Sequence, residues 1–305
     1  MEIIANTLDF YLNKETAAAI GKFDGIHIGH RRLLDEILSR KKDGLAACVF
    51  TFDPAPAVFF GGSDGRELTT KEEKRFLFER MGVDILVEFP LNRETAAMAP
   101  ETFVSEVLVR RMNVSFLAAG KDLSFGARGA GNAELLRQMG LKLGFGVGII
   151  DKVCLEDREV SSTYVRSQVE AGNMELADRL LGMPYMVAGR VVRGKQLGRT
   201  IGFPTVNIIP GSGKLLPPAG VYFSQVRCKD KLYRAVSNVG YKPTVTSEKT
   251  LGVESYLYDY GGDMYDMLIE VYLHSFRRPE QRFESVEALR RQLEEDIRAV
   301  VKYNM

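Results

Sequence analysis

The stretch Ala17-Ala18-Ala19-Ile20-Gly21-Lys22-Phe23-Asp24-Gly25-Ile26-His27-Ile28-Gly29-His30 decides the fold of the first half of the chain. A short apolar run leads into a glycine-bearing turn, and apolar residues then recur at helical spacing, at Leu33, Leu34, Ile37 and Leu38. The pattern predicts a strand, a tight turn and the start of a helix. Such a helix start presents unpaired backbone N–H groups and a partial positive charge, which suit a phosphate.

The two histidines of this turn, His27 and His30, offer further donors to a phosphate whose negative charge grows during a reaction. Two other interpretations are open for them. A metal site would need more ligands, but the three cysteines stand far apart in the chain and form no CxxC pair. The histidines would otherwise be two unrelated surface residues.

The composition is that of an ordinary globular protein of two domains. The chain has 305 residues, 45% of them hydrophobic and 27% charged, with a formal net charge of +1. This charge gives no general attraction to nucleic acid or to acidic membranes. The first residues show no signal-peptide pattern, and no apolar run is long enough to cross a membrane. We expect a cytoplasmic protein with no nucleic-acid or membrane partner, and a monomer or weak homo-oligomer.

Short apolar runs alternate with helical patterns over the first part of the chain, which predicts an α/β domain with a Rossmann-like parallel sheet. Strands are expected at 46–52, 84–89, 116–119 and 147–150, and helices at 71–81, 100–112 and from 132 to 139. The histidine turn, the Thr51–Pro54 turn and the Gly120–Asp122 turn all follow strands. We therefore expect them to share the edge where ligands bind in such sheets.

Strand-like segments dominate after residue 183, which predicts an antiparallel β-barrel or a compact sheet, followed by a terminal helix. The strands are expected at 186–192, 221–227, 232–236, 253–260 and 267–273, with a hairpin turn at 261–263. One helix is expected from Ser162 to Leu181 before the barrel, and the terminal helix carries Val286, Leu289, Leu293, Ile297 and Val300 on one face. The predicted domains are 1–182 and 183–305.

Two further segments have chemistry of their own. Ser161-Ser162-Thr163-Tyr164-Val165-Arg166 places hydroxyls and an arginine at a helix start, where they either cap the helix or bind phosphate oxygens. The loop Arg193–Gly202 combines three glycines with three cations, a composition suited to covering phosphates, although it also fits a basic surface hairpin. Thr205 and Asn207, two residues apart, point the same way on an extended backbone and carry oxygens that suit Mg²⁺.

Several motifs in order give the chain a family resemblance. Gly21–His30, Gly120–Gly126 and Ser161–Arg166 resemble the adenylyltransferase half of bacterial bifunctional riboflavin kinase/FAD synthetases. Gly198–Asn207, Asn238–Thr244, the segment around Glu254, and Arg278–Phe283 resemble the kinase half, and the likeness covers nearly the whole chain.

The resemblance implies an enzyme that phosphorylates riboflavin with ATP and then adenylylates FMN to FAD, with Mg²⁺. In the first domain it implies catalysis by His27, His30 and Arg166, a nucleotide site at Gly21, Phe23, Asp24, Gly25, Gly29, Ser162 and Thr163, and a flavin site at Asp122, Phe125 and Gly126. In the second it implies Glu254 as the base, nucleotide binding by Gly194, Lys195, Gly198, Arg199, Gly202 and Pro204, flavin binding by Asn238 and Arg278, and metal binding by Thr205 and Asn207.

The chain departs from the family pattern at Lys22, where asparagine is common, and at Ala55, where histidine is common. Two alternatives to the bifunctional enzyme are therefore a kinase whose first domain has lost adenylylation and a flavin-binding regulator without turnover. His274 has no motif partner and is expected to be structural or on the surface.

Overall fold

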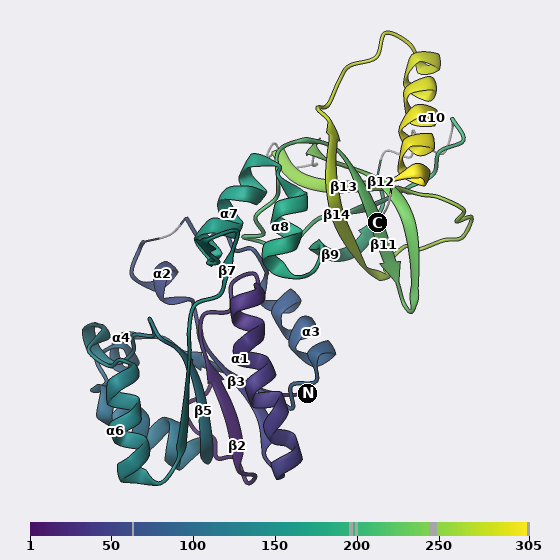
Figure 1. The fold of residues 1–305 in the computed structure, drawn as a ribbon. Coiled ribbons are helices and arrows are strands. Elements are labelled where there is room, and N and C mark those ends of the chain that lie inside the picture. The colour runs from purple at the N-terminus through teal and green to yellow at the C-terminus, as the bar shows by residue number, and fades with distance from the viewer. Residues whose placement is uncertain (63, 195–197, 199–200, 244–248, 304–305) are drawn as a thin grey trace. The chain divides into compact units, whose positions relative to one another are not determined.

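The computed structural model describes residues 1–305 apart from 63, 195–197, 199–200, 244–248 and 304–305. The chain forms two compact units (Figure 1). The first comprises residues 1–66 and 71–161, and the second comprises residues 67–70 and 162–305.

The first unit is built on a six-stranded sheet in which every pair of neighbours is parallel. The order across the sheet is β1 (Glu2–Ala5), β4 (Ile85–Pro90), β3 (Ala46–Asp53), β2 (Thr16–Ile20), β5 (Val114–Gly120) and β6 (Gly146–Ile150). The chain proceeds from β2 outward to β4, then returns to the other side of β2 for β5 and β6. The carboxyl ends of β2 and β5 thus flank the point where the strand order reverses, which is where such sheets bind ligands.

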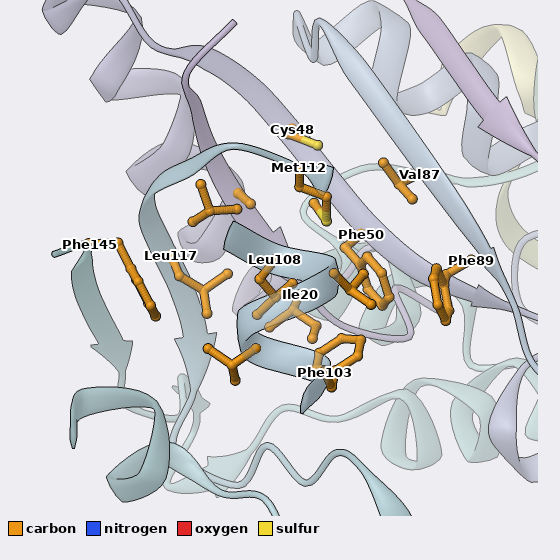
Figure 2. Close-up of a cluster of buried hydrophobic side chains, with 14 of the residues drawn as sticks. Ile20, Cys48, Phe50, Val87, Phe89, Phe103, Leu108, Met112, Leu117 and Phe145 are labelled. Atoms are coloured by element: carbon orange, nitrogen blue, oxygen red, sulfur yellow. The ribbon is translucent and has the colours of Figure 1, made fainter. Parts of the chain in front are cut away.

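Helices cover both faces of this sheet. Figure 1 shows α1 (Ile28–Ser39) and α3 (Lys71–Met81) on one side of the strands and α6 (Ala133–Leu143) on the other. Buried aromatic and aliphatic side chains fill the face toward α6 (Figure 2). They come from the strands and from the helical segment that begins at Phe103, and include Ile20, Phe50, Phe89, Phe103 and Leu117. Shorter elements are η1 (Arg40–Asp43), α2 (Pro56–Phe59), α4 (Arg93–Ala96), η3 (Ala127–Gly129) and the strand pair β7 (Cys154–Leu155) and β8 (Arg158–Glu159).

The predicted α/β fold is confirmed in this unit, with two local differences. The edge strand β1 was not expected, because four residues give too short a pattern to distinguish from an irregular N-terminus. The helix expected at 100–112 begins with α5 (Pro100–Thr102) and continues as a π-helical segment, η2 (Phe103–Arg111).

The second unit contains a closed antiparallel barrel, as predicted, with six strands rather than the five expected. Its strands follow the order β10 (Thr205–Ile208), β13 (Lys249–Leu257), β12 (Lys231–Pro243), β11 (Gly220–Cys228), β14 (Leu268–Arg278) and β9 (Tyr185–Val192), and β9 pairs with β10 to close the barrel. The terminal helix is α10 (Val286–Lys302). Val300 of this helix packs on the outer side of the barrel against Val221, Phe223 and Val236.

Buried and half-buried side chains alternate along β13 from Val253 to Leu257. Ser224, Ser237 and Ser255 are fully buried or nearly so, and their hydroxyls form a ladder with oxygen–oxygen distances of 2.7 Å at each step. On β13 the neighbours of Ser255 at Glu254 and Tyr256 are half-buried and point outward. The outer face of β13 is therefore the face that carries Glu254.

Two expectations for this unit are wrong. The single helix expected at 162–181 is two helices, α7 (Ser162–Ala171) and α8 (Met174–Leu181), because Gly172 adopts a φ of +77° and turns the chain between them. The segment at 261–263 is not a hairpin turn: β13 pairs with β10 and β12, whereas β14 pairs with β11 and β9. In the closed barrel β13 and β14 are not neighbours, so Gly261 and Gly262 lie in the connection between them rather than in a hairpin turn.

Candidate active sites

The histidine turn after β2 is held in shape by its own backbone and side chains. Gly25 has a φ of +86°, and His27 caps α1 by accepting the His30 N–H at its Nδ1, 3.3 Å away. Because Nδ1 is the acceptor, the neutral imidazole of His27 carries its proton on Nε2 and presents a donor there. The two imidazole rings stack with their centroids 3.7 Å apart.

Close packing fixes the rest of this turn. The Phe23 ring is fully buried, with its centroid 5.1 Å from that of His30. An added Cβ at Gly21 would lie 3.1 Å from the Phe23 ring, and one at Gly29 would lie 3.1 Å from the His27 ring. Glycine at both positions therefore lets the backbone pass close to the two rings. Asp24 and Gly25 lie in the same turn, between Gly21 and Gly29 in the sequence.

Both histidines are neutral at pH 7. Burial lowers the pKa of His27 to about 4, although the carboxylate of Asp122 opposes this shift. Burial lowers the pKa of His30 as well, and repulsion from His27 and Lys74 adds to it. The Nδ1 atom of His30 is buried and has no hydrogen-bond partner among the described residues. Neutral imidazoles interact with phosphate by donating hydrogen bonds, without a full positive charge.

The predicted flavin residues after β5 lie at the neighbouring strand end. Asp122 is close enough to influence His27, so the expectation that these two turns share one edge is confirmed. The Phe125 ring, by contrast, is buried and packs 5.6 Å from Phe103. Gly126 has a φ of +70° and passes against Pro100 with no room for a Cβ.

A cluster of charged residues at the same edge was missed by the sequence reasoning. Lys71 and Arg75 of α3 form ion pairs with the buried Glu88 of β4, with Arg75 Nη2 2.5 Å and Lys71 Nζ 3.2 Å from its Oε2, and Lys71 also pairs with Asp53 at the end of β3. Lys74, between them on α3, is buried near His30. The spacing of Lys71, Lys74 and Arg75, which are three and four residues apart on the predicted helix, is the sequence signal that could have identified this cluster.

The two departures from the family pattern lie in this region. Lys22 is exposed, and its backbone carbonyl accepts a hydrogen bond from the Thr51 hydroxyl at 3.4 Å. Ala55 precedes α2 and makes no side-chain cap. Ser162, Thr163 and Arg166 lie on the first turns of α7, within the second unit, and their role in nucleotide binding stays a prediction.

A row of polar side chains crosses the outer face of the barrel. Asn207 of β10 lies directly opposite Glu254 of β13, which in turn lies opposite Asn238 of β12. Side chains paired in this way point to the same face of the sheet, with Cβ atoms about 4.5–5.5 Å apart. Thr205 donates its hydroxyl to Glu254 Oε1 at 2.5 Å, which fixes the orientation of the carboxylate.

Gly194, shortly after β9, lies over one end of this row. Asn207 is buried under Gly194, where an added Cβ would lie 2.6 Å from the Asn207 amide. Gly198 accepts the N–H groups of Ile201 and Phe203, and a Cβ on it would meet the Phe203 carbonyl at 2.3 Å. Gly202 has a φ of +87° and Pro204 is exposed. The predicted phosphate-binding residues Lys195 and Arg199 lie outside the described residues.

The predicted flavin residues of the barrel extend the row at its other end. Val221 of β11 is paired with Asn238 on one side and with Arg278 of β14 on the other. Arg278 forms an ion pair with Asp296 of α10, which is fully buried, at 2.7 Å. Asn207, Glu254, Asn238 and Arg278 therefore come together, although they are far apart in the sequence.

His274 is structural, as expected: it is buried on β14, and its Nε2 lies 3.0 Å from Gln225 Oε1. Within the described residues no group of three or more His, Cys, Asp or Glu side chains could hold a metal ion. No helix that the structure describes is long and apolar enough to span a bilayer.

Comparison with known proteins gives both halves of the chain a family. Residues 10–164 match the family model of FAD synthetase and residues 181–304 match that of riboflavin kinase. A solved structure described as a macrolide-efflux protein from Streptococcus pneumoniae is 28% identical, covers 99% of both chains and superposes with a TM-score of 0.86.

Curated relatives cover nearly the whole chain as well. The bifunctional riboflavin kinase/FMN adenylyltransferase of Escherichia coli (strain K12) is 38% identical over 91% of this chain and 89% of its own. The protein of the same name from Bacillus subtilis (strain 168) is 31% identical over 99% of this chain and 98% of its own. The chain thus belongs to the family of bifunctional riboflavin kinase/FMN adenylyltransferases.

Proposed function

We propose that this chain makes flavin cofactors in two steps, phosphorylating riboflavin to FMN in the barrel and adenylylating FMN to FAD at the histidine turn. The observation that carries the first step is the row on the barrel, where a carboxylate oriented by a threonine hydroxyl lies between two amide side chains. Both family models match the chain, so the loss of one activity is not favoured.

In the kinase step, Glu254 accepts the proton of the terminal ribityl hydroxyl as that oxygen attacks the γ-phosphorus of ATP. The hydrogen bond from Thr205 holds the carboxylate in one orientation, so little reorganisation is needed when the proton arrives. The described glycines of the loop, Gly194, Gly198 and Gly202, let backbone N–H groups approach the phosphates of ATP.

The same residues fit a magnesium ion. Thr205 and Asn207 present hard oxygen donors on one face of β10, which is the chemistry that Mg²⁺ requires. When bound there, the ion would balance the charge of the ATP phosphate oxygens.

In the adenylylation step the FMN phosphate is the nucleophile and needs no strong base. The contribution of the enzyme is positioning and charge stabilisation. His27 donates from Nε2 to the phosphate oxygens, and the N-terminus of α1 adds backbone donors. We also propose a cytoplasmic location and a monomer or weak homo-oligomer.

The test is incubation of the purified protein with ATP and Mg²⁺ and either riboflavin or FMN, followed by chromatography. We expect FMN and FAD from riboflavin, and FAD from FMN. Neither product would refute the proposal, and FMN without FAD would restrict it to the kinase step. Glu254→Ala should abolish FMN formation and leave the conversion of FMN to FAD intact, because its carboxylate belongs to the barrel site alone.

A further inference from the structure

The amide of Asn238 is held in one orientation by a carboxylate outside the barrel strands. Asn238 Nδ2 donates to Glu280 Oε1 at 2.8 Å, and Glu280 follows the end of β14. A carboxylate only accepts hydrogen bonds, so this contact selects the amide orientation in which Nδ2 faces Glu280. The carbonyl oxygen Oδ1 must then face the other way.

That carbonyl oxygen is buried and lacks a partner. Asn238 Oδ1 accepts no hydrogen bond from any residue that the structure describes. Burying an acceptor without a donor is destabilising, so such an atom is typical of a site that a ligand completes. Asn238 lies directly opposite Glu254, the proposed base, and on the same face of the barrel.

The backbone beside Asn238 makes room for this arrangement. Gly240, two residues further along β12, is buried, and an added Cβ there would lie 2.1 Å from Glu280 Oε1. Any side chain at this position would therefore displace the carboxylate. The φ of Gly240 is not in the left-handed region, so backbone conformation does not require glycine here. The close approach of the Glu280 carboxylate does.

We propose that Glu280 is a positioning residue of the kinase site, which turns Asn238 so that its Oδ1 accepts a hydrogen bond from a second substrate hydroxyl. This inference rests on the proposed phosphorylation of riboflavin. Glu254 and Asn238 face each other across paired strands, with Cβ atoms about 4.5–5.5 Å apart, so both side chains can contact one ribityl chain. Glu254 takes the proton of the terminal hydroxyl while Asn238 binds the hydroxyl next to it, and the site selects substrates that carry both.

Three substitutions of Glu280 separate this role from a purely structural one. Glu280→Gln keeps an acceptor for Asn238 Nδ2 and should leave the KM for riboflavin within about twofold of the wild type. Glu280→Ala removes the acceptor and should raise that KM about tenfold, the equivalent of one lost hydrogen bond. Glu280→Lys offers only donors, so it favours the flipped amide and should raise the KM furthest.

The KM for ATP should not change in any of the three variants. Gly240→Ala, which displaces the carboxylate without altering it, should behave like Glu280→Ala. Glu284→Lys, at an exposed position of the same segment, is the matched control and should behave like the wild type. Thermal melting of each variant checks that it is folded.

A substrate analogue provides an independent readout. The wild type should phosphorylate 4′-deoxyriboflavin, which lacks the neighbouring hydroxyl, with a KM about tenfold above that for riboflavin, whereas Glu280→Lys should not discriminate between the two. Equal KM values for riboflavin across the Glu280 series in an active wild type would refute the positioning role. An inactive wild type would instead refute the proposed function.

Discussion

The ion pair between Arg278 and Asp296 joins the polar row of the barrel to helix α10, and breaking it tests both stability and function. Asp296 is fully buried and accepts from Arg278 Nη2 at 2.7 Å and from Nε at 3.1 Å, while Gln292 Nε2 lies 3.3 Å away. We predict that Asp296→Asn keeps the shape of the side chain but leaves the guanidinium with one neutral acceptor in place of a carboxylate.

The magnitude follows from these contacts. A hydrogen bond to a charged group contributes about 1.5–3 kcal/mol, and losing one member of a buried ion pair costs about 3–5 kcal/mol. Since the Arg278 side chain is 17% exposed, water solvates part of the released charge. We therefore expect a loss of about 2–3 kcal/mol in the free energy of unfolding, or about 5–10 °C in the melting temperature of the barrel unit.

A double variant separates the charge from the fold. Replacing both partners with apolar side chains, as in Arg278→Met with Asp296→Leu, removes the unpaired charge and should recover most of the lost stability. If Arg278 also binds the flavin, the double variant should retain a raised KM for riboflavin despite its recovered melting temperature. A melting temperature of Asp296→Asn within about 2 °C of the wild type would refute the reasoning.

Three further predictions concern groups outside the proposed chemistry of the barrel. The pKa of His27 falls from 6.5 to about 4 on folding, so between these values only the unfolded chain binds a proton there. The free energy of unfolding should therefore drop by about 3 kcal/mol as the pH falls through this window. Denaturant titrations of His27→Asn should show a smaller drop, and an unchanged pH dependence would contradict the assignment. Asp178 has the opposite sign: burial raises its pKa to about 8 against the opposing Tyr185 N–H, so the folded chain alone keeps a proton between pH 3.8 and 8 and loses stability as the pH rises. Asp178→Asn, which cannot ionise and still accepts from Tyr185, should therefore melt above the wild type at pH 8 and show no such gain at pH 4. Lys214→Met should destabilise the second unit by about 2–4 kcal/mol, because Lys214 Nζ donates at 2.6 Å to the carbonyls of Leu68 and Met186 in buried surroundings. Limited proteolysis should then cut the segment at 67–70 faster in Lys214→Met than in the control Lys231→Met, which changes an exposed lysine. Equal rates would contradict the idea that Lys214 holds this segment in place.

The histidine turn shows how far a local pattern reaches. Its strand, turn and helix are contiguous in the sequence, so the position of His27 at the start of α1 followed from hydrophobic spacing alone. The pattern could not predict the surroundings of the two imidazole rings. The neutral state of His27 and His30 depends on burial, and Lys74 comes from a helix more than forty residues further along the chain.

The barrel site could not be predicted in the same way. Asn207, Glu254 and Asn238 meet only through strand pairing, and the register of a pair is set by the whole barrel rather than by either strand. The misread turn at 261–263 shows the difficulty, since consecutive strands there are not neighbours. The family resemblance identified these residues because it assigns their roles directly, without any need to predict which strands pair.

The strand register also holds the side chains of the polar row on the outer face of the barrel. A shift of one residue between β12 and β13 would turn Glu254 into the barrel and bring Ser255 outward, because side chains alternate between the two faces. The buried hydroxyl ladder of Ser224, Ser237 and Ser255 opposes such a shift, since its 2.7 Å contacts exist in one register only. The apolar interior would also have to accept a carboxylate without a partner, which is far more costly than losing a hydroxyl contact. The same alternation that buries the serines therefore holds the proposed base on the outer face, opposite Asn238.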